Sequence, residues 1–252
     1  MGAIHFSIDP VLAALLAKRL ELTVFIETGT FKGDSVAAVR PSFEELHTCE
    51  LSPELHAAAT QRFANDPAVH CHLGSSPDRL RALAAIHARH PVMYWLDAHW
   101  CSAAQTAGEE SQCPLLEELE AIAPLHPESI VWIDDARYFM APPTAPLEAR
   151  GWPTFQQVLD CLQSLSTQHH LVFANDTILF HPARIAGEVA TYLHTQGADW
   201  LAIAHASRLT DELRATCEQL RIACEQRHER PAGRSQFRKW FRAVRRRPVP
   251  TP

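Results

Sequence analysis

Short apolar runs alternate with amphipathic stretches along the first 135 residues of the chain. The runs with strand character cover residues 24–27, 46–50, 69–73, 92–96 and 130–133. The stretches with helical spacing cover residues 11–17, 33–39, 53–63, 78–90 and 114–122. Five strands that alternate with helices predict a parallel sheet with helices on both of its faces.

The pattern changes beyond residue 154. A helix is predicted over 155–165, followed by two strands over 170–174 and 177–181. Only Asn175 and Asp176 separate these strands, and both residue types tolerate the positive φ of a tight hairpin. The predicted fold class is therefore α/β: a Rossmann-like doubly wound sheet, mostly parallel, with a terminal antiparallel hairpin and a C-terminal helical extension.

The same pattern predicts three regions. Residues 1–183 form the α/β domain, residues 184–230 a helical extension and residues 231–252 a basic tail. Within the extension, an apolar seam with spacings of four, four, three and four residues is formed by Leu209, Leu213, Cys217, Leu220 and Cys224. Two interpretations stay open: the seam packs on its own domain, which we favour slightly, or it forms a coiled coil in a homodimer.

Charge is distributed unevenly along the chain. The net charge is -6, but residues 231–252 hold seven Lys or Arg and no acid, which leaves 16 basic and 29 acidic residues, a net charge of -13, for the remainder. Such an acidic body argues against nucleic acid as a partner. The tail reads either as a solvated, disordered segment or as a basic amphipathic helix that contacts a membrane surface or an acidic partner.

The expected cellular compartment is inferred from three features that the sequence does not contain: a signal peptide, a membrane-spanning apolar run and a CxxC pair. The apolar stretch 11–17 follows Asp9 and Pro10 and no basic segment, so it predicts a capped helix, not a signal peptide. No apolar run approaches the roughly 18 residues that span a bilayer. The seven cysteines include no CxxC pair. We expect reduced thiols and a cytoplasmic location, with the tail adding a candidate peripheral contact at the inner membrane surface.

A glycine turn joins the first strand to the helix after it. Gly29 and Gly33 stand in this turn, where backbone can approach a ligand closely. The pyrophosphate fingerprint GxGxxG is absent, and a carboxylate, Glu27, stands at the turn instead. This arrangement suits a cationic cofactor better than a diphosphate. The alternative is a turn with only a structural role.

Two further segments fit the same cofactor pocket. Glu50 ends the second strand 21 positions after Gly29, where an acid can accept hydrogen bonds from both ribose hydroxyls. Ser75 and Ser76 follow the third strand, near the expected adenine edge. The alternatives are a solvent-exposed strand-end acid for Glu50 and an ordinary helix cap for the serines.

Three aspartates directly follow buried-looking strands that we expect to be neighbours. Asp97 follows the fourth strand, and Asp134 and Asp135 follow the fifth. Like charges that close need a cation or a shared proton. Oxygen ligands favour Mg²⁺, Mn²⁺ or Ca²⁺, and such an ion could lower the pKa of a substrate hydroxyl. His99 is a candidate general base. The alternative is that these aspartates cap loops and helices.

Five short segments carry motifs. They are Glu27-Thr-Gly-Thr-Phe-x-Gly-x-Ser35, Leu96-Asp-Ala-His-Trp100, Cys113-Pro-Leu-Leu-Glu-Glu-Leu119, Ile133-Asp-Asp-Ala-Arg137 and Trp152-Pro-Thr154. Over roughly residues 20–183 the chain resembles bacterial class I methyltransferases associated with glycan biosynthesis, whose sheet also ends in a hairpin. The placement of its acids is similar to that in metal-dependent macrocin-type sugar O-methyltransferases. Relatives commonly have Ser-Gly-Gly where this chain has Ser102-Ala103-Ala104, within a polar stretch that we expect to cover the mouth of the site.

The resemblance implies an S-adenosylmethionine (SAM)-dependent methyltransferase that methylates a hydroxyl of a sugar or glycan. The implied cofactor residues are Glu27, Thr28, Gly29, Thr30, Gly33, Ser35, Glu50, Ser75, Ser76 and Asp97. The implied Mg²⁺ ligands are Asp97, Asp134 and Asp135, and the implied catalytic residues are His99 and Asp97. Two alternatives remain: a non-catalytic, cofactor-binding scaffold in a glycan-assembly complex, and an NAD-dependent oxidoreductase.

Overall fold

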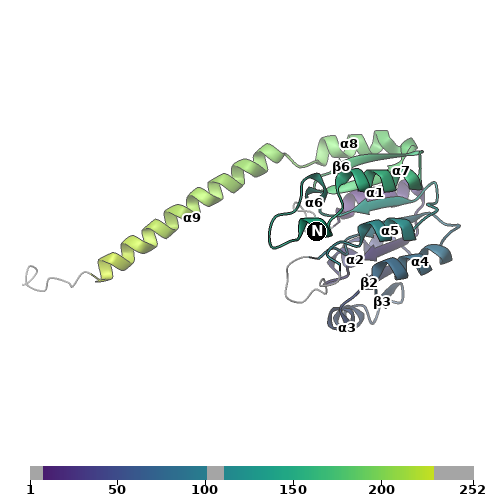
Figure 1. The fold of residues 1–252 in the computed structure, drawn as a ribbon, viewed down its shortest axis with the longest axis horizontal. Helices are drawn as coiled ribbons and strands as arrows, with labels where there is room; N and C mark the ends of the chain where they lie inside the picture. Colours follow the sequence, from purple (N-terminus) through teal and green to yellow (C-terminus); the bar gives the residue numbers. More distant parts are fainter. Residues whose placement is uncertain (1–7, 101–110, 230–252) are drawn as a thin grey trace, which may run out of the picture. The chain divides into compact units, whose positions relative to one another are not determined.

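The computed structural model describes residues 8–100 and 111–229, with side chains to residue 222, and this part of the chain contains a seven-stranded sheet (Figure 1). Its strands are β1 (Val24–Thr28), β2 (Glu45–Glu50), β3 (Val69–Leu73), β4 (Val92–Leu96), β5 (Ile130–Ile133), β6 (His169–Ala174) and β7 (Thr177–Pro182). Their order is β3-β2-β1-β4-β5-β7-β6. Strands β1 to β5 are parallel, and β7 runs antiparallel to β5 and β6. The predicted fold class is confirmed.

Helices cover both faces of this sheet. They are α1 (Pro10–Leu20), α2 (Asp34–Val39), α3 (Pro53–Arg62), α4 (Ser76–Ile86), α5 (Leu115–Ala121), α6 (Arg137–Met140), α7 (Phe155–Leu165) and α8 (Ala186–Gln196), with short 3₁₀ turns η1 (Arg40–Ser42), η2 (Ala149–Gly151) and η3 (Ala183–Ile185). Helices α4, α5 and α7 lie side by side over one apolar cluster (Figure 1). Residues of α1, α2 and α8 belong to a second apolar cluster on the opposite face.

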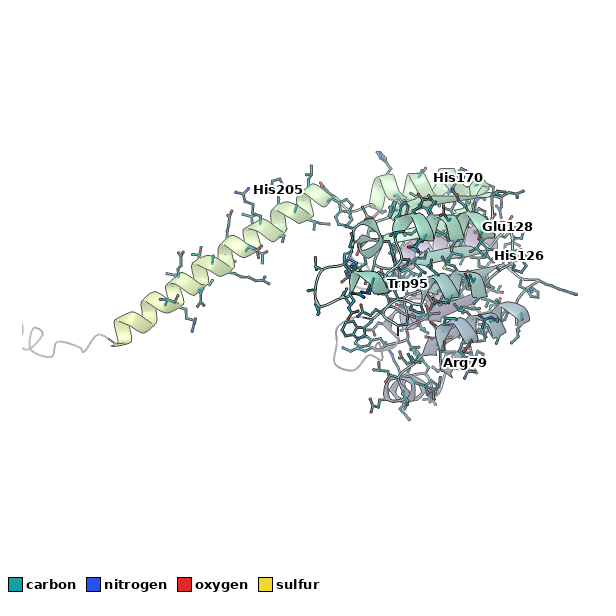
Figure 2. The ribbon with its side chains drawn as sticks, in the orientation of Figure 1. Arg79, Trp95, His126, Glu128, His170 and His205 are labelled. Carbon is teal, nitrogen blue, oxygen red and sulfur yellow. The ribbon has the colours of Figure 1, made fainter. Side chains whose placement is uncertain are left out.

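Two buried tryptophans hold the central strands together. Trp95 lies on β4 and is labelled in Figure 2. Its ring meets that of Trp132 on β5 edge to face, with the ring centroids 5.6 Å apart. The Trp132 Nε1 donates to Thr177 Oγ1 on β7 at 2.6 Å. Aromatic pairs of this geometry add about 0.5–1.5 kcal/mol beyond burial. The carboxyl ends of β4 and β5 are thereby fixed next to each other.

Local sequence signals account for most helix starts. The Asp9 carboxylate caps α1 by accepting from the backbone N–H groups of Val11 and Leu12, and Ser52 caps α3. The predicted bounds of one helix were wrong: residues 78–90 were expected, but α4 runs from Ser76 to Ile86. Proline at the second position of α4 is compatible with this earlier start, because the first backbone N–H groups of a helix need no partner within it.

The chain divides into two compact units, Met1–Gly197 and Ala198–Pro252. We expected the first domain to end at residue 183, whereas α8 still packs on it: Val189 is buried, Tyr192 Oη donates to Asp9 Oδ2 at 2.8 Å, and Arg19 pairs with Glu188. The added apolar contact explains the later boundary.

The second unit contains α9 (Trp200–Glu229). The seam residues Leu209, Leu213 and Leu220 are all more than 60% exposed on it. The side chain of Cys224 and the basic tail over 231–252 lie outside the described residues. Among the helices described, none is long and apolar enough to cross a membrane.

Candidate active site

The site lies at the carboxyl edge of the parallel strands, where the turn after β1 meets the end of β4. Gly29 has φ +78°, and a Cβ there would lie 2.1 Å from the carbonyl oxygen of Asp97. The Asp97 N–H donates to Thr28 Oγ1 at 3.1 Å. Glycine is therefore required at position 29 both by backbone conformation and by this close approach.

Several residues predicted to bind cofactor have structural contacts of their own. Gly33 has φ +75°, and a Cβ there would meet the Phe63 ring at 2.7 Å, so packing on the end of α3 explains this glycine. The hydroxyls of Thr30 and Thr48 lie 2.6 Å apart. Ser35 is buried at the start of α2. These residues shape the turn.

Glu27 is a buried carboxyl at the floor of the site. Its side chain accepts a hydrogen bond from Thr48 Oγ1 at 2.5 Å on the paired strand β2. Burial is the main cause that raises its pKa to about 8; the charges of Asp97 and Glu50 act in the same direction, and the hydrogen bonds from Thr48 and Ser35 oppose it. The surroundings of Glu27 thus favour its neutral form.

Glu50 is held in a fixed orientation at the end of β2. Its Oε2 accepts from the backbone N–H of Phe31, and its Oε1 accepts from that of Ser52, both at 2.8 Å. A carboxylate has about four acceptor positions. Two remain for a ligand, which is compatible with the predicted contact to ribose hydroxyls.

The predicted adenine side of the pocket contains an acid that sequence reasoning missed. Ser76 is buried, whereas Ser75 is exposed at the cap of α4. The hydroxyls of Ser76 and Thr28 both hydrogen-bond Glu118 of α5, yet burial still raises the pKa of Glu118 to about 6. The Glu118 Oε1 is buried without a hydrogen-bond partner among the described residues. In the sequence, this segment was noted only for its Cys-Pro-Leu-Leu-Glu-Glu-Leu motif, and no role was predicted for Glu118.

Asp97 and Asp134 form an acidic pair at the ends of β4 and β5. The structure brings these two predicted residues together, because the Asp134 N–H donates to the Leu96 carbonyl at 3.1 Å, next to Asp97. Burial raises the pKa of Asp97 to about 6 and that of Asp134 to about 8. The charge of Asp97 contributes to the raised pKa of Asp134. Burial therefore favours the neutral form of both acids.

Asp135 has the opposite electrostatic setting. Burial raises its pKa, but the hydrogen bond and charge of His99, together with Arg137, outweigh burial and hold the pKa of Asp135 below its usual range. His99 Nε2 lies 2.7 Å from Asp135 Oδ2 and 3.5 Å from Asp97 Oδ1. Arg137 Nη1 lies 2.6 Å from Asp135 Oδ1. Asp135 has φ +54°, an uncommon conformation for a residue other than glycine.

The hairpin supplies another residue that the sequence did not reveal as part of the site. Arg137 also donates to Asp176 in the β6–β7 turn, whose carbonyl accepts from Ala136 N–H at 2.8 Å. The sequence indicated only the turn itself, and Asn175 adopts the expected positive φ of 59°. The hairpin thus braces the Asp135 segment.

An aromatic wall stands beside His99. The ring centroid of His99 lies 5.4 Å from that of Trp152 and 6.4 Å from that of Tyr138. The Arg137 guanidinium lies 4.3 Å from the Tyr138 ring centroid. The Trp152 Nε1 donates to Gln112 Oε1 at 3.2 Å. The segment expected to cover this mouth lies mostly within residues 101–110, outside the described part of the chain.

Solved structures with similar folds identify the architecture. No family model and no curated protein matches the sequence. An O-methyltransferase from Bacillus cereus in complex with SAH superposes with a TM-score of 0.50 at 11% identity, over 69% of this chain and 82% of that chain. This chain has the methyltransferase fold. Its sheet order, with the antiparallel β7 beside β5, agrees with that assignment.

Two more solved structures align over a similar share of the chain. A putative caffeoyl-CoA O-methyltransferase from Staphylococcus aureus is 15% identical with a TM-score of 0.48, over 69% of this chain and 84% of that one. The O-methyltransferase TomG from Streptomyces achromogenes, in complex with SAM, is 18% identical with a TM-score of 0.47, over 68% and 78%. In all three cases the identity is too low to transfer a substrate or a residue role.

Proposed function

We propose that this chain is a SAM-dependent O-methyltransferase that acts on a hydroxyl of a sugar or glycan. The observation that carries the proposal is the set of buried carboxyls Glu27, Asp97 and Asp134, whose pKa values burial raises to between about 6 and about 8 at the carboxyl edge of a methyltransferase fold. A buried acid of this kind ionises when a positive charge binds beside it. SAM carries two such charges, a sulfonium and an ammonium, and no phosphate.

Different residues of the pocket would bind different parts of the cofactor. Glu27 and Asp97 face the positive groups, and Gly29 allows the ligand to approach the backbone. Glu50, already fixed by two backbone N–H groups, keeps two acceptor positions for the ribose hydroxyls. Ser75 and Ser76 lie where the adenine edge would follow β3. When bound, SAM supplies a methyl group on a sulfur that is a good leaving group.

His99 is the proposed general base. With its Nε2–H donated to Asp135 Oδ2, its Nδ1 carries the lone pair that accepts the acceptor hydroxyl's proton. Asp135 then orients the ring and stabilises the imidazolium that forms, the role of the carboxylate in a catalytic triad. Arg137 and Asp176 keep Asp135 in place. The methyl carbon gains a bond to oxygen as its bond to sulfur breaks.

The charge of the domain favours a neutral acceptor. Residues 1–230 carry a net charge of -13, from 16 basic and 29 acidic residues, which repels phosphorylated acceptors such as CoA thioesters. A polyhydroxylated ring matches a mouth lined by Tyr138, His99 and several carboxylates. The motif resemblance to glycan-associated methyltransferases points to the same acceptor class.

A divalent cation fits part of the aspartate set. Asp97 and Asp134 offer oxygen ligands suited to Mg²⁺, and a cation bound beside them would favour the ionised forms that burial disfavours. Asp135 is already neutralised by His99 and Arg137, so it becomes a ligand only by exchanging one of these contacts. When bound, the ion would lower the pKa of the acceptor hydroxyl.

Methyl transfer from labelled SAM to a panel of methyl glycosides tests the proposal. We expect label in a sugar ether, and slower transfer when EDTA removes divalent ions. SAM binding without transfer to any sugar would favour the non-catalytic scaffold and contradict the proposal. Saturable binding of NADH in a fluorescence titration, without SAM binding, would instead support the oxidoreductase.

A further inference from the structure

A histidine cluster lies at the opposite edge of the sheet from the candidate active site. Glu45 begins β2 and His47 lies two residues along it, so both side chains are on the same face of the sheet. His87 follows the last residue of α4, before β4. Each of these three residues offers one ligand atom, and the three atoms lie within 4.8 Å of one another.

We propose that Glu45, His47 and His87 form a binding site for a borderline transition-metal ion of the Zn²⁺ type, separate from the candidate active site. Two imidazoles and one carboxylate are a ligand set that zinc accepts, with a fourth position open to water. Mg²⁺ and Ca²⁺ prefer oxygen ligands only. The inference stands independently of the proposed methyl transfer.

The state of His87 points to a ligand. His87 is 8% exposed, and its Nε2 has no hydrogen-bond partner within residues 8–100 and 111–229. A buried polar nitrogen without a partner is unfavourable, because no hydrogen bond offsets its loss of hydration. The residue lies at the C-terminal end of α4, where the helix dipole favours a positive charge. A metal ion placed there would satisfy both features.

His47 is oriented as metal-bound histidines usually are. Its Nε2 lies 3.0 Å from Glu45 Oε1, and its Nδ1 lies 3.0 Å from His72 Nε2. When His47 Nδ1–H donates a hydrogen bond to His72 Nε2, His47 Nε2 carries the lone pair that a metal ion would bind. Ligands bound tetrahedrally at about 2.1 Å lie about 3.4 Å apart, so little movement is needed.

A metal ion can reach the site from solvent because Glu45 is a partly exposed ligand. The Glu45 side chain is 42% exposed, whereas that of His47 is 8% exposed. A metal held here would tie β2 to the segment between α4 and β4. Along the strand, Glu45 is about 16 Å from Glu50 of the cofactor pocket, at about 3.3 Å per residue. The two sites can therefore be loaded independently.

Metal titration of the full-length, untagged chain tests the site. Zn²⁺ is titrated by calorimetry in excess Mg²⁺, which occupies oxygen-only sites. We expect one equivalent to bind with micromolar or tighter affinity and to raise Tm. Since losing an outer-shell partner costs about 10–100-fold, we expect His72→Gln to weaken binding about 10-fold and His87→Gln about 100-fold or more. Glu45→Gln, at an exposed position, serves as the ligand variant least able to disturb folding.

Two controls keep the result specific. His90→Gln changes an exposed histidine three residues from His87 and should leave the affinity unchanged. Co²⁺ in place of Zn²⁺ should give visible d–d bands without the near-ultraviolet thiolate band that a cysteine site produces. No Zn²⁺ binding, equal affinity in the wild type, Glu45→Gln and His87→Gln, or a thiolate band would each overturn the proposal.

Discussion

The two ends of the sheet hold ionisable clusters that burial affects in opposite directions. At the carboxyl end, burial raises the pKa values of Glu27, Asp97 and Asp134. At the amino end, it lowers the pKa of His47. Desolvation disfavours the charged form in both places, so acids keep protons and histidines lose them. We propose a cation-binding cofactor pocket at the carboxyl end and a site for a borderline metal ion at the amino end.

The largest expected effect separates chemistry from binding at the carboxyl end. His99→Gln should lower kcat for methyl transfer by about 100- to 10,000-fold, the usual contribution of a general base, while SAM affinity stays within a few-fold of the wild type. Steady-state kinetics and calorimetry measure the two quantities. His126→Gln, in the loop before β5, is the matched control. A kcat near that of the wild type would remove His99 from the mechanism.

The next effect is a pH dependence to which the acidic cluster and the buried histidines contribute with opposite signs. The folded-state pKa values of Glu27 and Asp134, both about 8, lie above those of the unfolded chain. At these two acids the folded state therefore binds more protons than the unfolded state between about pH 4 and 8, so their contribution to stability falls as pH rises through that window. The lowered pKa of His47 acts in the opposite direction between about pH 4 and 6.5. We therefore expect the ligand-free protein to lose a few kcal/mol mainly between about pH 6.5 and 8.

Ligand and variant sharpen this pH prediction. SAM should stabilise the protein more at pH 8 than at pH 6, because its positive charges compensate the ionised acids. Glu27→Gln should flatten the profile of the ligand-free protein. Urea denaturation at several pH values measures both. A profile that rises steadily from pH 6.5 to 8 would contradict the raised pKa values of the two acids.

A smaller effect is expected at the brace between the hairpin and the end of β5. Arg137→Gln leaves Asp135 and Asp176 without their shared cation and should lower the free energy of unfolding by about 1–2 kcal/mol. The exposed part of the Arg137 side chain, 41%, keeps the loss modest. Arg81→Gln, in an exposed pair with Asp78, should change stability by less than about 0.5 kcal/mol. Equal losses of stability in Arg137→Gln and Arg81→Gln would show that the Arg137 contacts contribute no more than an exposed ion pair.

Local and nearest-neighbour features of the fold were predictable from sequence. The bounds of β3, β4 and β5 match the apolar runs, and the adjacency of β4 and β5 follows from their alternation with helices. That adjacency predicts from sequence alone that Asp97 and Asp134 lie beside each other. The four-residue helix α6, by contrast, is too short for periodicity to reveal.

Contacts between distant segments were not predictable in the same way. Asp176 reaches Arg137 only because β7 inserts between β5 and β6, which no local pattern encodes. His47 and His87 are 40 positions apart and meet through the packing of α4 on β2. Glu118 reads as an ordinary polar helix position until α5 is placed against Thr28 and Ser76. Electrostatic roles at both ends of the sheet depend on such contacts.

Calorimetric titration of SAM into the wild type and Asp97→Asn tests the central claim most directly. Asp78→Asn, at a side chain that is 75% exposed, is the matched control. Removing one partner of a buried charge pair costs about 2–5 kcal/mol, so Asp97→Asn should bind SAM at least about 30-fold more weakly, with Asp78→Asn unchanged. Absence of SAM binding by the wild type, or equal binding by all three proteins, would contradict the account of the acidic cluster as a cation-binding cofactor pocket.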